Sequence, residues 1–275
     1  MNRRLVAVLV PVVALGLTAC TGNDPKTELQ ESTSGLQAGN YSFSVAMPGG
    51  SSAKSVVHKP SHTASIDYVS KTADGDATVN LRFVEPDRFM KLTADMGDSA
   101  KQLQAMQAAG AGANPADTKL VQGLQAMVDM FSGKTWMKVD MSKVTENAEL
   151  KVDFANPDLT GVSDLLKTAA TAERKDDVIT GKLDVTAAGD DTHLLGKSAF
   201  AGVDATAGKS VPYEATLDDD GRLTKLVLDM PKTSEAEAGK WTVEVSQYGS
   251  AAQQEAPPAD QVQEAPDSAY EMLNS

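Results

Sequence analysis

The sequence contains little of what builds several common kinds of functional site. Of its 275 residues, one is cysteine, three are histidine and 5% are aromatic. One cysteine excludes an internal disulfide, and so few soft ligands argue against a typical zinc or iron–sulfur site. Basic residues are outnumbered, with 25 Lys and Arg against 38 Asp and Glu and a formal net charge of -13. That charge repels phosphate backbones, so we expect no nucleic-acid partner.

Recognisable catalytic and metal-binding motifs are also missing. Residues 202–210 end like a phosphate-binding loop, but the spacing between the two glycines is one residue too long. The acids at 218–220 lack the alternation of a calcium loop and indicate a hairpin turn instead. His58 and His62 are separated by a proline and cannot share a regular helix face, and His193 has no G-x-S-x-G motif beside it. We therefore expect a protein that is not an enzyme and that holds no cofactor and no metal.

The N-terminus has the pattern of an export signal. Arg3 and Arg4 precede an apolar run over residues 5–17, and Leu-Thr-Ala-Cys follows at its end. The run is too short for a transmembrane helix, which needs roughly 20 apolar residues. Small residues before Cys20 resemble the bacterial lipobox, in which the cysteine thiol receives diacylglycerol and becomes the first residue of the mature protein. An ordinary secretory signal with an incidental cysteine is the alternative.

These features predict the organisation of the chain. Residues 1–19 are the expected signal peptide, and Cys20 with the tether to residue 26 is the expected membrane anchor. The folded domain is expected over 27–249, and the Pro-, Gln- and Glu-rich residues 250–275 have the composition of a disordered acidic tail. The expected location is the extracytoplasmic face of the plasma membrane, where acyl chains hold the protein.

Alternation of apolar and polar residues dominates the folded part and predicts β-strands with one apolar face. Clear examples are residues 41–47, 79–83, 179–185, 213–217 and 241–245. Turn-forming residues at 74–75, 85–87 and 220–221 separate such segments at hairpin spacing. Consecutive antiparallel pairing follows, and about ten strands is the size at which an open sheet curls. The expected fold class is α+β, with a curved antiparallel sheet of about ten strands.

Several segments have helical patterns instead. Helices are expected over residues 27–38, 99–109, 116–132 and 158–172. Leu120, Leu124, Met127 and Phe131 share one helix face, and flexible methionine side chains suit a surface for variable acyl chains. We expect the helices to cover the concave face of the sheet, although the stripe is also typical of an ordinary core helix. The candidate lipid-cavity residues are Met106, Leu120, Leu124, Met127, Val128, Phe131, Leu165 and Leu166.

A family resemblance rests on the order of several short features, most of them in the C-terminal third. These are the lipobox, a first helix ending at Gly39, a strand meander, central helices, V-P-Y-E-A-T-L-D at 211–218, D-G-R-L at 220–223, the strand 223–230, Tyr-Gly at 248–249 and A-P-P-A-D-Q-V at 256–262. Taken together, the chain resembles the actinobacterial LppX/LprAFG lipoprotein family. The matching stretches are turns and strands, so they support the fold more than the ligand.

The resemblance implies a half-open antiparallel β-barrel with helices over its concave face, similar to the LolA/LolB carriers. Such a half-barrel encloses a cavity for acylated lipids or lipoglycans that are carried between envelope layers, and we expect a monomer. The low aromatic content and the Ala- and Gly-rich residues 110–114 depart from the family pattern. The alternative is a surface interaction or sensory lipoprotein of the same fold, with its cavity closed by side chains.

Overall fold

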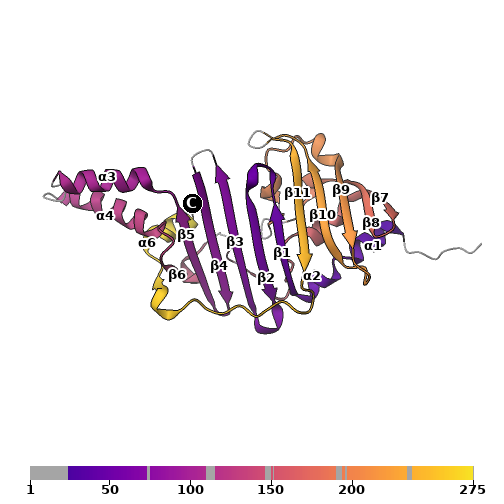
Figure 1. The fold of residues 1–275 in the computed structure, drawn as a ribbon, viewed down its shortest axis with the longest axis horizontal. Helices are drawn as coiled ribbons and strands as arrows, with labels where there is room; N and C mark the ends of the chain where they lie inside the picture. Colours follow the sequence, from indigo (N-terminus) through magenta and orange to yellow (C-terminus); the bar gives the residue numbers. More distant parts are fainter. Residues whose placement is uncertain are drawn as a thin grey trace, which may run out of the picture.

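Within the described residues, one sheet of twelve strands organises the chain, and Figure 1 shows how its strands lie side by side. The computed structural model describes residues 24–72, 75–109, 115–145, 150, 152–189, 194–195, 197–233 and 237–274. Cys20 and the expected signal peptide lie outside these residues. Within the described part of the chain, no helix combines the length and apolar character needed to cross a membrane.

The sheet is open and almost entirely antiparallel. Its strands are β1 (Asn40–Ala46), β2 (Ser52–His58), β3 (Thr63–Thr72), β4 (Gly75–Val84), β5 (Asp87–Ala94), β6 (Trp136–Lys138), β7 (Ala169–Lys175), β8 (Val178–Leu183), β9 (Val211–Leu217), β10 (Leu223–Met230), β11 (Gly239–Ser246) and β12 (Val262–Glu264). Their order across the sheet is β12-β6-β5-β4-β3-β2-β1-β11-β10-β9-β8-β7. Among the strands described, β12 and β6 pair in parallel and the other neighbours are antiparallel. The expectation of a mixed α+β fold with a large antiparallel sheet is confirmed. The count of about ten is low because β6 and β12 have three residues each, too few for alternation to reveal.

The two faces of the sheet differ as the alternation predicts. On β1, Tyr41, Phe43 and Val45 are buried, whereas Ser42 and Ser44 point to the other side. Helices and connecting segments lie behind the sheet in the view of Figure 1. We call the side with the buried residues of β1 the covered face and the opposite side the open face.

The helices are short outside one pair. They are α1 (Pro25–Glu31), α2 (Ser34–Ala38), α3 (Gly97–Ala108), α4 (Pro115–Met130), α5 (Val162–Lys167) and α6 (Asp267–Leu273). Short 3₁₀ segments are η1 (Pro48–Gly50), η2 (Lys59–Ser61), η3 (Met141–Lys143), η5 (Val185–Ala187), η6 (Lys197–Phe200), η7 (Ala207–Ser210) and η8 (Ala259–Gln261). The single helix expected over 27–38 is divided into two helices, α1 and α2. At the junction, the hydroxyl of Ser32 donates to the Leu29 carbonyl and the hydroxyl of Thr33 donates to the Gln30 carbonyl, and such side-chain bonds compete with helix continuation.

The helix expected over 158–172 is shorter than the sequence pattern predicts. The Asp158 carboxylate accepts hydrogen bonds from the N–H groups of Thr160, Gly161 and Ser163, which forms a tight loop instead of a first helical turn. Gly161 is left-handed, with φ 74°, so α5 begins after it. From Ala169 the chain enters β7, where pairing with β8 overrides its helical propensity.

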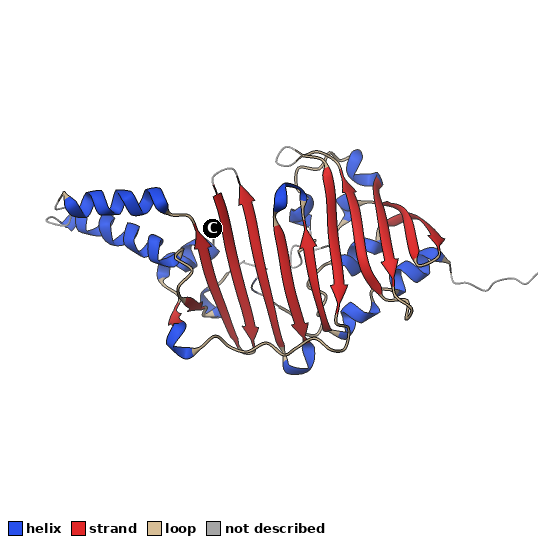
Figure 2. Ribbon diagram, in the orientation of Figure 1, coloured by secondary structure: helices blue, strands red, loops and turns tan. Residues whose placement is uncertain are grey.

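The helices α3 and α4 form a hairpin that extends beyond one end of the sheet, as Figure 2 shows. The hairpin leaves the end of β5, where the Ala94 N–H donates to the Phe131 carbonyl at 3.0 Å and the Gly133 N–H to the Leu92 carbonyl at 2.9 Å. Of the apolar stripe, Phe131, which directly follows α4, packs against the main core. The expectation that these helices cover the concave face is therefore wrong, because much of their apolar surface faces the other helix of the hairpin or solvent.

Gly123, in the middle of α4, allows a test of this placement. A Cβ atom added there would meet nothing within 4 Å. Since glycine in a helix interior costs about 0.5–1 kcal/mol relative to alanine, Gly123→Ala should stabilise the hairpin. We expect hydrogen exchange of its amides to slow about two- to fivefold.

The matched control for that variant is Gly181→Ala on β8, where the added Cβ would collide with the Thr171 carbonyl. This control should destabilise the sheet. If Gly123→Ala also destabilises the protein, α4 is packed against another part of the molecule.

The C-terminal stretch 250–275 is not the disordered tail that its composition predicts. Residues through 274 are described, β12 pairs with β6, and α6 buries Ala269, Tyr270 and Leu273. The Tyr270 hydroxyl accepts a hydrogen bond from the Asp140 N–H at 2.9 Å. The prediction failed because a three-residue strand and a seven-residue helix are too short to show periodicity within a proline-rich segment.

Candidate functional site

The structure separates the predicted cavity residues into two groups. Leu165 and Leu166, on α5, are 0% exposed within the core. On the hairpin, Leu120 and Met127 are 58% and 45% exposed. The remaining candidates are partly buried on the hairpin or at its base: Met106, Leu124, Val128 and Phe131. The eight candidates therefore do not line one site, and Cys20 lies outside the described residues.

The covered face is mostly apolar across the strands on the β5 side of β1. One row, read across paired strands, contains Phe43, Ser55, Ile66, Leu81, Met90 and Met137. The next row contains Val57, Ala64 and Phe83 and then the buried Arg88. Alternation predicted the inward-facing positions of Phe43, Leu81 and Phe83, but nothing in the sequence indicated that Arg88 would lie beside them.

The segment that covers this face is attached to the sheet at Tyr41. Its hydroxyl donates to the Pro157 carbonyl at 2.8 Å and accepts from the Leu159 N–H at 3.1 Å. Burial, with the nearby Asp158 carboxylate as the second cause, raises the pKa of Tyr41 well above its usual value. The phenol therefore stays neutral and keeps both hydrogen bonds.

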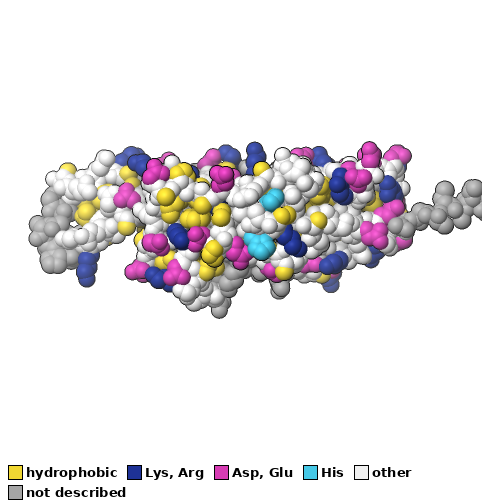
Figure 3. Space-filling model, turned by 90° about the horizontal axis from the view of Figure 1, so that it is seen from below, with side chains coloured by type: hydrophobic (Ala, Val, Ile, Leu, Met, Phe, Trp, Pro, Cys, Tyr) yellow, Lys and Arg dark blue, Asp and Glu magenta, His cyan; other side chains and the backbone are white. Residues whose placement is uncertain are grey.

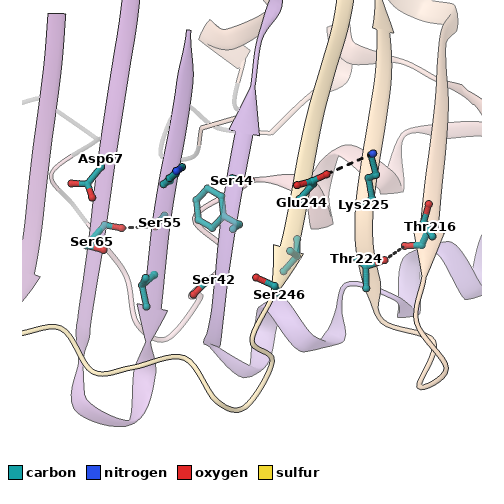
Figure 4. A pocket seen from close by; sticks show the side chains of 14 residues that line it. Ser42, Ser44, Ser55, Ser65, Asp67, Thr216, Thr224, Lys225, Glu244 and Ser246 are labelled. Atoms are coloured by element: carbon teal, nitrogen blue, oxygen red, sulfur yellow. Dashed lines mark hydrogen bonds and ion pairs between the residues drawn. The ribbon is translucent and has the colours of Figure 1, made fainter. Parts of the chain in front are cut away.

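A hollow of about 610 Å³ lies on the open face, over strands from both halves of the sheet (Figure 4). Its lining residues are Ser42, Phe43, Ser44, Lys54, Ser55, Val56, Ser65, Asp67, Thr216, Thr224, Lys225, Glu244, Val245 and Ser246. Most of the lining residues therefore carry hydroxyl or charged side chains. The sequence predicted polar residues on these strands but not the pairing of β1 with β11 that brings them together.

The polar groups of this hollow are partly engaged with one another. Lys225 Nζ lies 3.6 Å from Glu244 Oε1, and the Thr224 hydroxyl donates to the Thr216 carbonyl at 3.1 Å. The Ser42 hydroxyl donates to Gln247 Oε1 at 2.6 Å. None of the lining residues is histidine or cysteine, and the hydroxyl, carboxylate and ammonium groups of the hollow can form hydrogen bonds with a polar molecule.

A second hollow, of about 300 Å³, lies at the start of β5 and the end of β6. It is lined by Pro86, Asp87, Lys138, Val139, Asp140, Met141 and Glu264. Lys138 Nζ lies 2.8 Å from Asp87 Oδ1, and this hydrogen bond raises the pKa of the lysine. Hydrogen bonds from the Ser142 hydroxyl and N–H lower the pKa of Asp140.

Viewed from below in Figure 3, acidic and basic side chains are scattered in small groups.

His58 and His62, the two histidines within the described residues, form no shared site, and His193 lies outside those residues. His58 Nδ1 lies 2.6 Å from the Ser61 hydroxyl, whereas His62 Nδ1 lies 3.2 Å from Glu85 Oε2. Across the described residues, no group of three or more His, Cys, Asp and Glu side chains is placed to hold a metal ion.

Comparison with known proteins adds no identification: no family model matches the chain, and no curated protein matches it. The resemblance to the LppX/LprAFG lipoproteins stays a prediction.

Proposed function

We propose that this chain is a membrane-anchored lipoprotein of the cell envelope that binds acylated lipids or lipoglycans and carries them between envelope layers. One observation carries the proposal: a large open sheet whose apolar face is covered by short helices and irregular segments instead of a second sheet. Such a cover can separate from the sheet without breaking the ladder of backbone hydrogen bonds between strands. A half-barrel that opens in this way can admit acyl chains.

The energetics favour such a site. An acyl chain exposed to water costs about 25 cal/mol for each Å² of apolar surface, and contact with the apolar rows of the covered face removes that cost. A carrier of this kind needs no energy source of its own. The expected lipid anchor at Cys20 would hold it in the envelope.

The two ends of the sheet support a division of roles. The α1 helix, which follows the expected anchor, contacts β7 at one edge, and the hairpin leaves β5 near the other edge (Figure 1). With about 4.8 Å between strands, the edges are on the order of 50 Å apart. The exposed side chains of Leu120 and Met127 therefore offer an apolar contact far from the anchor.

A charge placed on the hairpin tests this contact. Met127→Asp should lower lipid uptake about tenfold, because the carboxylate loses hydration when an acyl chain covers it. Ala126→Asp is the matched control, since Ala126 is also exposed and lies on the same helix. Lipid occupancy is measured by native mass spectrometry, with circular dichroism to verify the fold. Equal uptake by the two variants would remove the hairpin from the path of the lipid.

The proposed function itself is tested on the chain lacking residues 1–20, purified from an actinobacterial host. Native mass spectrometry with lipid extraction should detect diacyl or triacyl lipid at near-stoichiometric level. A protein that is consistently empty and also fails to take up added lipids would contradict lipid carriage.

A second candidate function is that of an interaction or sensory lipoprotein. The observation that favours it is the filling of the covered face by side chains, including the fully buried Leu165, Leu166 and Ile179. The larger of the two hollows described above lies instead on the open face, and most of its lining residues carry hydroxyl or charged side chains. An empty protein in the lipid experiment would shift the assignment to this function, with the open face as the surface to examine.

A further inference from the structure

A buried arginine lies at one end of the apolar covered face. Arg88 is the second residue of β5 and pairs with Phe83, which in turn pairs with Ala64. Phe83 and Ala64 are 0% exposed and Arg88 is 9% exposed. Because Arg88 closely follows the turn between β4 and β5, its side chain lies near the rim of the covered face.

The guanidinium has few partners for so buried a charge. Its Nη1 donates to the Asp87 carbonyl at 3.1 Å, and its carbon lies 5.5 Å from the centre of the Phe83 ring. The Nε atom is buried without a hydrogen-bond partner. Among the described residues, no carboxylate forms an ion pair with Arg88.

The acids nearest in sequence are engaged elsewhere. The pleat places Asp87 and Arg88 on opposite faces of β5, and Asp87 Oδ1 lies 2.8 Å from Lys138 Nζ. Glu85 Oε2 lies 3.2 Å from His62 Nδ1. These two acids therefore leave the guanidinium without a direct counter-ion.

A buried charge without a counter-ion is costly. Burial lowers the pKa of Arg88, against the smaller opposing effects of Glu85 and Asp87. Arginine nevertheless keeps its proton inside proteins, so it does not escape the cost by becoming neutral. A bound anion that accepts hydrogen bonds from the guanidinium would remove the cost.

We propose that Arg88 forms an anion-binding subsite at the rim of the covered face and that its ligand is a phosphate group. A guanidinium binds phosphate oxygens through paired N–H groups, and the free Nε supplies one of them. One source of phosphate, the headgroup of a phospholipid with its acyl chains along the apolar rows, rests on the lipid-binding function proposed above. The other source is free phosphate.

The test compares three ligands on the full chain in a nonionic detergent. Dioctanoyl phosphatidylglycerol carries a phosphate, dioctanoylglycerol carries the same acyl chains without it, and inorganic phosphate carries no chains. Arg88→Gln should weaken binding of the phospholipid at least tenfold and leave dioctanoylglycerol unchanged, whereas Arg88→Lys should retain part of the affinity. Arg82→Gln is the control, since Arg82 lies on the neighbouring strand, faces the open side and pairs with Asp67 at 2.9 Å.

The outcomes separate the two proposals. If Arg88→Gln loses binding of the phospholipid but keeps binding of dioctanoylglycerol, the result supports the subsite and a headgroup ligand. If the protein binds inorganic phosphate in an Arg88-dependent way but binds neither lipid, the result supports the subsite and contradicts lipid carriage. Equal effects of Arg88→Gln on both lipids, or no effect on any ligand, would overturn the subsite. If the wild-type protein binds both lipids equally well, the lipid-binding function is supported and the subsite is overturned. If the wild-type protein binds none of the three ligands, both proposals are overturned.

The assay also allows for an unfolded glutamine variant. In that case the comparison is the rise in melting temperature with phosphate in the wild type and in Arg88→Lys. The wild type should gain more from phosphate than the lysine variant at equal ionic strength, and equal gains would overturn the subsite.

Discussion

Replacing Asp158 by alanine should lower the free energy of unfolding by about 3–5 kcal/mol. The carboxylate is buried and accepts hydrogen bonds from the N–H groups of Thr160 at 3.0 Å, Gly161 at 3.2 Å and Ser163 at 2.9 Å. Alanine would leave these donors buried without acceptors in the loop that crosses the covered face. Urea denaturation followed by circular dichroism measures the change.

The matched control for this prediction is Asp153→Ala. Asp153 is exposed and accepts a hydrogen bond from the Ala155 N–H at 2.8 Å, so its loss should cost less than about 1 kcal/mol. Asp158→Asn, which keeps one side-chain oxygen, should fall between the two. If Asp158→Ala and Asp153→Ala destabilise equally, the buried carboxylate does not organise the cover.

Deleting residues 259–275 should lower the free energy of unfolding by about 4–6 kcal/mol. The deletion removes β12 and α6, and with them the buried side chains of Ala265, Ala269, Tyr270 and Leu273. It also removes the hydroxyl that accepts from the Asp140 N–H. Urea denaturation of the shortened chain gives the measurement, and an unchanged midpoint would mean that this stretch is the dispensable tail that its composition predicts.

Two adjacent single substitutions locate the effect on α6. Leu273 is buried and Met272 is exposed, so Leu273→Ala should cost about 2–3 kcal/mol and Met272→Ala less than about 1 kcal/mol. Equal losses at both positions would show that the inner face of α6 does not pack on the core.

Local patterns predicted much of the architecture. Alternation along residues 41–47 predicted β1 and its buried face, and the residues at 85–87 and 220–221 predicted the turns before β5 and β10. The stripe from Leu120 to Phe131 predicted α4. In each case the spacing of side chains along a few turns or pleats reports which face is apolar, and that information is local.

The candidate site was predicted less well. Leu120 and Leu165 have similar hydrophobicity and both belong to helical patterns, yet one is exposed on the hairpin and the other is fully buried. Periodicity shows that a helix has an apolar face but not what covers that face. The three-residue strands β6 and β12 carry no periodic signal at all.

What the sequence by itself determined is several of the longer strands, the turns at 85–87 and 220–221, and which residues of those strands face the core. The tertiary structure alone decided which face is covered, where the α3–α4 hairpin lies and that β1 pairs with β11, a contact across about 200 residues of chain. The physical reason is that local spacing selects dihedral angles and faces, whereas long-range pairing depends on burying those faces together against the entropy of closing large loops. Arg88 is charged in the sequence, but only the pairing of β4 with β5 and the burial of that face place it beside Phe83, where no carboxylate among the described residues forms an ion pair with it.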